Sequence, residues 1–273
     1  MATSSQLPEE QDELSFTSVN PSASETIVLL HGVLSSRLEF ALVAPHLSAY
    51  HLLLIDLNGH SGSFNVKPYG IHPAADAVAS VIRKHAHSGR AHVAGLSMGG
   101  FVTLDLARRF PDLVLSAWVT GAAPFEGLFR WMAEHPSAVY AIMTLTEAWT
   151  PDSLYWKVKG LCGLKRSDEL LREMRSNRRW EVVREVYAGI LQIGFDEVRE
   201  IRTRTLTVAG GKQDDVRSTR KMGAALKQVN DKSRAVVVRD AVHAWDMQFP
   251  ELFAEGIKSW IEERPLPREF EDL

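Results

Sequence analysis

Short apolar runs alternate with segments of helical spacing along most of this 273-residue chain. The first of these runs are ETIVLLHG (residues 25–32), HLLLIDLNGH (51–60), AHVAGLS (91–97) and LSAWVTG (115–121). They are continuously apolar, which is typical of parallel strands covered on both faces. Helical spacing follows in the segments AADAVASVIRKHA and FVTLDLARRF. This order predicts an α/β fold with a mostly parallel sheet flanked by helices.

The alternation stops after Gly121 and resumes about eighty residues later. Residues 122–201 are rich in Trp, Met, Leu, Glu and Arg, a composition that favours helices. The strand runs TLTVAGG and RAVVVRD follow, and the helical segment PELFAEGIKSWIEE comes after them. We therefore expect one core built from residues 14–121 and 202–273, with an inserted helical cap at 122–201.

Both ends of the chain lie outside this pattern. Residues 1–13 are acidic and polar and are expected to form a disordered tail. The run LSFTSVN after them predicts one edge strand. The last nine residues, PLPREFEDL, are interpreted as a second tail.

Charge and cysteine content exclude several classes of protein. The 31 basic and 34 acidic residues are spread along the chain, so no basic face for nucleic acid is expected. The single cysteine, Cys162, permits no intrachain disulfide and fits a reducing compartment. The sequence shows no secretory signal pattern and no segment apolar enough to span a bilayer, so a cytoplasmic location is expected.

The stretch VAGLSMGGF (93–101) places Ser97 where a predicted strand passes into a predicted helix. Small residues on both sides of a serine, here Gly95 and Gly99, allow a sharp turn that exposes the hydroxyl at the carboxyl edge of a sheet. A phosphate-binding loop is disfavoured because the glycine spacing matches neither the dinucleotide fingerprint nor a P-loop. The pattern therefore indicates a nucleophile at Ser97.

A serine nucleophile needs a base, and the base needs a third group that orients it. Ten histidines are present, and His243 lies directly after a predicted strand, in a loop at the same sheet edge. The loop after TLTVAGG offers Asp214 and Asp215, either of which is able to orient an imidazole. Ser97 and His243 are thus the candidate nucleophile and base, with Asp214 preferred as the acid.

With these motifs in place, the chain resembles the α/β-hydrolase superfamily over about residues 25–263. The order serine, acid, histidine is the order of that family. The matching motifs are LLHGV (29–33), DLNGHSGS (56–63), GLSMGG (95–100), GGKQDD (210–215) and VHAW (242–245).

The resemblance adds roles to several residues. It favours Asp214 over Asp215, because the acid of the family usually lies three positions after the glycine that ends its strand. It implies an oxyanion hole formed by the backbone N–H groups of Met98 and Val33. It assigns His31 to shaping the oxyanion loop rather than to direct chemistry.

The resemblance also implies an activity. We expect a serine hydrolase that cleaves an ester, lactone or thioester through an acyl-enzyme, without a cofactor or a metal. The loop sequence HGV, in place of the HGGG of many lipases, favours a small or medium-sized substrate. Alternatives are a non-hydrolytic reaction on the same triad, such as carbon–carbon cleavage, a lyase reaction or cyclisation, and a ligand-binding receptor.

Large apolar side chains are frequent in the expected cap. Phe125 and Phe129 lie nearest the sheet edge in sequence, so we expect them to contact the small-molecule substrate. The sequence leaves the oligomeric state and the identity of the substrate open.

Overall fold

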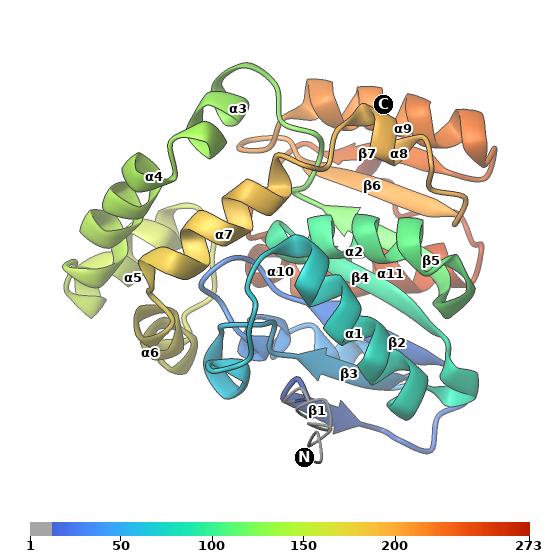
Figure 1. Cartoon of the computed structure of the whole chain (residues 1–273), viewed down its shortest axis with the longest axis horizontal. Coiled ribbons are helices and arrows are strands. Elements are labelled where there is room, and N and C mark those ends of the chain that lie inside the picture. The colour runs from blue at the N-terminus through green and yellow to red at the C-terminus, as the bar shows by residue number, and fades with distance from the viewer. Residues whose placement is uncertain (1–12) are drawn as a thin grey trace, which may run out of the picture.

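The computed structural model describes residues 13–273, which form an eight-stranded sheet covered by helices on both faces (Figure 1). Apart from Glu13, the tail predicted over residues 1–13 lies outside the described residues.

The sheet has the strand order β1-β3-β2-β4-β5-β6-β7-β8. The strands are β1 (Phe16–Val19), β2 (Thr26–Leu30), β3 (His51–Ile55), β4 (Ala91–Leu96), β5 (Val114–Thr120), β6 (Thr205–Gly210), β7 (Arg234–Val238) and β8 (Phe270–Asp272). The six central strands pair in parallel, and the two edge strands pair antiparallel with β3 and β7. The predicted mostly parallel sheet is therefore confirmed, and so is the edge strand predicted at LSFTSVN.

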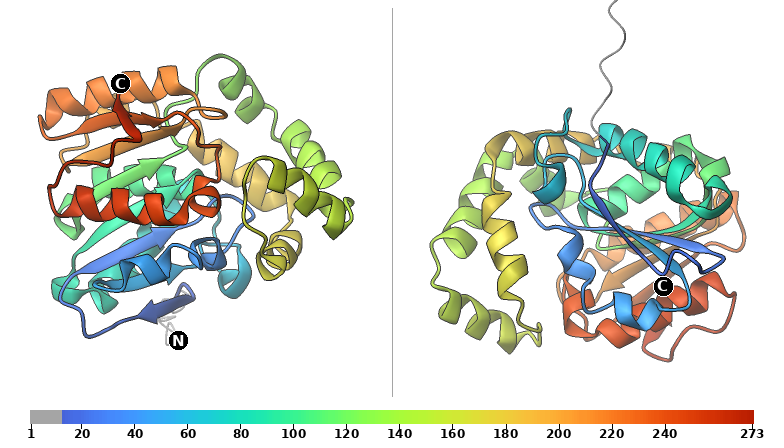
Figure 2. Two further views of the ribbon diagram at one scale, coloured as in Figure 1. Left: turned by 180° about the vertical axis from the view of Figure 1, so that it is seen from behind. Right: turned by 90° about the horizontal axis from the view of Figure 1, so that it is seen from below.

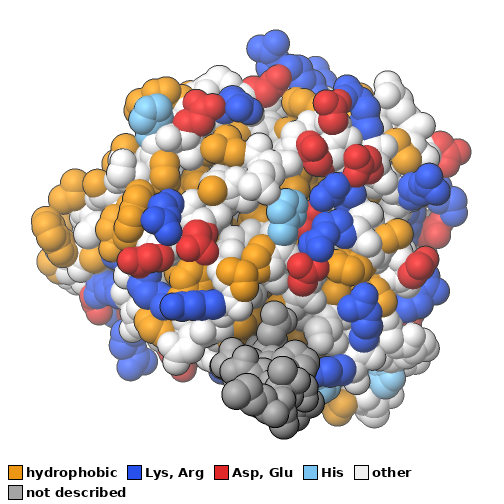
Figure 3. Space-filling model, viewed as in Figure 1, with side chains coloured by type: hydrophobic (Ala, Val, Ile, Leu, Met, Phe, Trp, Pro, Cys, Tyr) orange, Lys and Arg blue, Asp and Glu red, His pale blue; other side chains and the backbone are white. Residues whose placement is uncertain are grey.

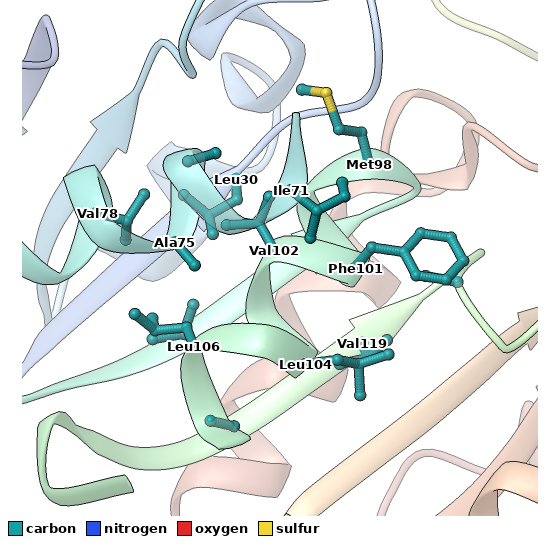
Figure 4. Close-up of a cluster of buried hydrophobic side chains, with 14 of the residues drawn as sticks. Leu30, Ile71, Ala75, Val78, Met98, Phe101, Val102, Leu104, Leu106 and Val119 are labelled. Carbon is teal, nitrogen blue, oxygen red and sulfur yellow. The ribbon is translucent and has the colours of Figure 1, made fainter. Parts of the chain in front are cut away.

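Three helices cover one face of the sheet: α1 (Ile71–His85), α2 (Met98–Arg109) and α9 (Val216–Val229). Leu30 of β2 packs there with Ile71 of α1 and with Phe101 and Val102 of α2 (Figure 4). On the other face lies α11 (Pro250–Ile261), which crosses the sheet in the view from behind (Figure 2). Burial on both faces explains why the strand sequences are continuously apolar.

The C-terminal segment forms a strand, so the prediction of a tail at PLPREFEDL is wrong. In β8, Phe270 pairs with Val238 of β7. The Phe270 side chain is 7% exposed, and its ring lies 5.8 Å from the rings of Trp118 and Trp245. Three residues after two prolines carry too little periodicity to reveal a strand in the sequence.

Between β5 and β6 the chain forms a series of helices, here called the insertion. They are α3 (Gly127–Glu134), α4 (Pro136–Met143), a π-helix (Thr144–Ala148), α5 (Asp152–Leu161), α6 (Asp168–Ser176), α7 (Trp180–Ile190) and α8 (Phe195–Val198). Helices α3 to α6 lie to one side of the sheet in every ribbon view (Figures 1 and 2). Val182, Val186 and Ile190 of α7 join the core of α1 and α2, which anchors the insertion to the sheet.

The outer side of the insertion carries most of the exposed large apolar side chains of the described residues, seen as hydrophobic atoms at the left of the molecule (Figure 3). Trp149 and Leu161 are 74% and 83% exposed. No helix within residues 13–273 combines the length and the apolar character that crossing a bilayer requires.

Candidate active site

Ser97 occupies a strained turn between β4 and α2. Its backbone angles are φ 55° and ψ −118°, a conformation that non-glycine residues rarely adopt. The turn is tight: a Cβ on Gly95 would lie 2.1 Å from the carbonyl oxygen of Gly99, and one on Gly99 would lie 2.0 Å from that of Leu30. Both glycines predicted to permit the turn are therefore required by close backbone contacts.

His243 and Asp214 form a hydrogen-bonded pair on the loops after β7 and β6. Nδ1 of His243 lies 2.5 Å from Oδ1 of Asp214. The second carboxylate oxygen, Oδ2, accepts a 2.7 Å hydrogen bond from the N–H of Gly210. The Asp214 side chain is 5% exposed and the His243 side chain is 41% exposed, so the acid is buried behind the imidazole.

Two opposing effects act on the pKa of His243. Burial alone would lower it, but the carboxylates of Asp214 and then Glu39 outweigh burial and raise it above the usual value. The positive imidazolium is therefore stabilised at this position.

The neighbouring acid, Asp215, has a different environment. Its Oδ1 accepts a 2.9 Å hydrogen bond from the N–H of Ser218, which caps the N-terminus of α9. Its Oδ2 accepts a 2.7 Å hydrogen bond from the Ser218 hydroxyl. Of the two candidate acids, only Asp214 contacts the imidazole.

One cavity of about 200 Å³ brings most of the predicted site residues together. Ser97, Asp214 and His243 line it from the sheet edge, and Phe125 and Phe129 line it from the insertion. Met132 and Tyr187 complete the apolar wall. Ser97 and His243, both within the described residues, face this cavity without a hydrogen bond between them. Such bonds are often long before substrate binds.

The loop after β2 is tied to the N-terminus of α2. The N–H of Gly99 donates a 3.0 Å hydrogen bond to the carbonyl oxygen of His31. Within residues 13–273, no protein acceptor is bonded to the amides of Val33 or Met98. Met98 is the first residue of α2, where helix amides carry partial positive charge.

Two buried histidines hold this loop in place. Nε2 of His31 accepts a 3.0 Å hydrogen bond from the N–H of Leu57, and Nε2 of His60 accepts one of 3.0 Å from the N–H of Leu34. Burial lowers the pKa of His31 to about 4 and that of His60 to about 3, so both rings are neutral at pH 7. The structure therefore gives His31 a loop-shaping position. His60 was missed in the sequence, although it lies within the DLNGHSGS motif.

Comparisons with known proteins identify the family and the fold of this chain. The model of the alpha/beta hydrolase family matches residues 27–256. An AB hydrolase superfamily protein of Gibberella zeae is 30% identical over 265 residues, covering 94% of this chain and 86% of the relative. A pimeloyl-[acyl-carrier protein] methyl ester esterase of Neisseria meningitidis is 27% identical over 263 residues, covering 89% of this chain and 95% of the relative.

Solved structures share the fold. A thermophilic esterase from Thermogutta terrifontis superimposes with a TM-score of 0.69 at 20% identity, covering 92% of this chain and 93% of that one. The enol-lactonase from Burkholderia xenovorans LB400 superimposes with a TM-score of 0.67 at 21% identity, covering 91% and 96%. The chain belongs to the alpha/beta hydrolase family, and the predicted α/β-hydrolase fold is confirmed.

Proposed function

We propose that this member of the alpha/beta hydrolase family is a serine hydrolase that cleaves an ester, lactone or thioester of a small or medium-sized substrate. The observation that carries the proposal is a cavity lined both by Ser97, in its strained turn, and by the His243–Asp214 pair. Relatives named as esterases, and an enol-lactonase of the same fold, support ester-type chemistry.

In the proposed reaction, Oγ of Ser97 attacks the carbonyl carbon of the substrate while Nε2 of His243 takes the hydroxyl proton. The Asp214 carboxylate accepts the Nδ1–H hydrogen bond and stabilises the imidazolium. The amides of Met98 and Val33 donate to the oxyanion. His243 then returns its proton to the leaving group, and water attacks the acyl-enzyme to release the acid and regenerate Ser97.

We further propose that the insertion acts as a cap that selects the substrate. Phe125 and Phe129 give one side of the cavity an apolar wall. Phe125 also lines a second cavity of about 490 Å³ between α3, α7 and α8. Phe125 therefore contributes to both cavities, and the second one offers room for a longer substrate chain.

Ester turnover tests the proposal. Wild-type protein should hydrolyse p-nitrophenyl acetate, and Ser97→Ala should lower kcat by a factor on the order of 10⁶, because the variant has no group able to form the acyl-enzyme. Thermal unfolding of the same samples serves as the control for folding. A folded Ser97→Ala variant with wild-type turnover would contradict the assignment, and a wild type that binds the ester without turnover would favour a receptor.

A further inference from the structure

A buried acid that the proposed triad does not use lies beside the candidate site. Glu39, in the short 3₁₀ helix η1 (Arg37–Phe40), is 8% exposed, and its Oε2 accepts a 2.7 Å hydrogen bond from the N–H of Gly32. A Cβ placed on Gly32 would lie 3.6 Å from Cβ of Ser97 and 3.8 Å from both carboxylate oxygens of Glu39. The carboxylate and the candidate nucleophile therefore flank the same glycine, one residue before Val33.

A second buried acid interacts with Glu39. Asp246, in α10 (Trp245–Gln248), is fully buried three residues after His243. Neither of its carboxylate oxygens forms a well-oriented hydrogen bond with any residue between 13 and 273, although the N–H groups of Asp246 and Met247 lie near enough to lower its pKa.

The pKa values of both acids are displaced upward. Burial and then the charge of Glu39 raise the pKa of Asp246, and burial raises the pKa of Glu39. Two neighbouring buried carboxyl groups resist double ionisation. The pair therefore retains one proton at pH values where exposed acids have lost theirs.

Glu39 interacts with charged and titratable groups from several elements. Its charge raises the pKa of His243 in the loop after β7, of Asp246 in α10 and of Tyr155 in α5 of the insertion. Burial and the charge of Lys159 in α5 lower the pKa of His243, whereas Asp214 and Glu39 raise it. Glu39 is thus hydrogen-bonded to the loop that carries Val33, and its charge acts on groups in the histidine loop and in the insertion.

We propose that Glu39 is a positioning residue with two roles. Its carboxylate holds the Gly32 amide and with it the loop that carries Val33, and it supplies a second negative charge toward His243 when the imidazolium forms. Asp246 carries the proton that limits the pair to one charge. The proposal rests on the proposed function, since it assumes that His243 accepts a proton during the reaction.

The test is an NMR titration of the His243 imidazole, whose signal is assigned by its absence in His243→Gln. Glu39→Gln retains an oxygen that accepts from Gly32 but removes the charge, so the His243 pKa should fall by about one unit. The acidic limb of kcat/KM for p-nitrophenyl acetate should move to lower pH by the same amount, and kcat should fall about tenfold. Asp246→Asn removes the group that carries the proton and leaves the Glu39 charge in place, so the His243 pKa should stay near the wild-type value.

Asp105→Asn is the matched control. Asp105 is a fully buried acid on α2 that pairs with His72, Arg108 and Arg109, so its loss should lower thermal stability without moving the His243 pKa. A wild-type His243 pKa in folded Glu39→Gln overturns the proposal. If that variant does not fold, Glu39→Asp keeps the charge on a shorter side chain, and a wild-type kcat there overturns the positioning role.

The titration needs no turnover, which separates this proposal from the proposed function. If Ser97→Ala keeps esterase activity while Glu39→Gln still lowers the His243 pKa, the assignment of Ser97 fails and the coupling of Glu39 to His243 is supported. If Ser97→Ala is inactive and the His243 pKa does not respond to Glu39→Gln, the assignment of Ser97 is supported and the coupling of Glu39 to His243 fails.

Discussion

At the scale of single residues, Asp214 and Asp215 are adjacent in sequence but have different partners. Asp214 contacts the His243 imidazole, whereas Asp215 caps α9. Asp214→Asn should lower kcat/KM by about 10⁴-fold, because the amide no longer holds the imidazole in the reactive tautomer. Asp215→Asn should change kcat/KM little, since asparagine also caps helices. Steady-state kinetics of both variants check this. A larger loss of kcat/KM in Asp215→Asn would mean that Asp215, not Asp214, orients the imidazole.

Local motifs determine which of these residues the sequence reveals. Ser97 and Gly99 lie within one short motif, and His243 follows directly after a strand, so pattern alone selects them. Glu39 and Asp246 are more than two hundred positions apart and interact only in the fold. No periodicity or motif marks either of them, because each lies in a short helical segment and the folded chain alone buries it.

At the scale of elements, the sequence of the insertion predicts its helices but not how they pack. Its composition indicates helices, but which helix face meets the sheet depends on packing against α1 and α2. Of the large apolar residues predicted there, Phe125 and Phe129 line the cavity, whereas Trp149 is 74% exposed and lies outside it. A count of aromatic residues alone does not separate these positions.

Phe125→Ala should enlarge the cavity beside Ser97 toward the second cavity that Phe125 also lines. We expect the ratio of kcat/KM for octanoyl over acetyl p-nitrophenyl esters to rise about tenfold, because added methylenes would then be buried. Trp149→Ala is the control and should leave the ratio at the wild-type value. An unchanged ratio in folded Phe125→Ala would show that this ring does not limit chain length.

At the scale of the complete fold, the C-terminal strand β8 forms one edge of the sheet and adds Phe270 to the core. Phe270 packs against Trp118 and Trp245, and Trp245 follows His243 by two residues. Phe270→Ala should lower the free energy of unfolding by about 3–5 kcal/mol, through lost burial and the cavity left behind. Urea denaturation measures this, with the exposed Leu161→Ala as a control expected to change stability by less than about 0.5 kcal/mol. A Phe270→Ala variant as stable as that control would mean that β8 contributes little to the fold.

Covalent labelling tests the proposed role of Ser97 as the nucleophile of a serine hydrolase. The protein is treated with a fluorophosphonate at pH 7.5–8, digested, and the modified peptide identified by mass spectrometry. We expect one adduct per chain, located on Ser97, and no labelling of Ser97→Ala or of protein unfolded before treatment. An adduct on another residue, or a folded wild-type protein that acquires none, would contradict it.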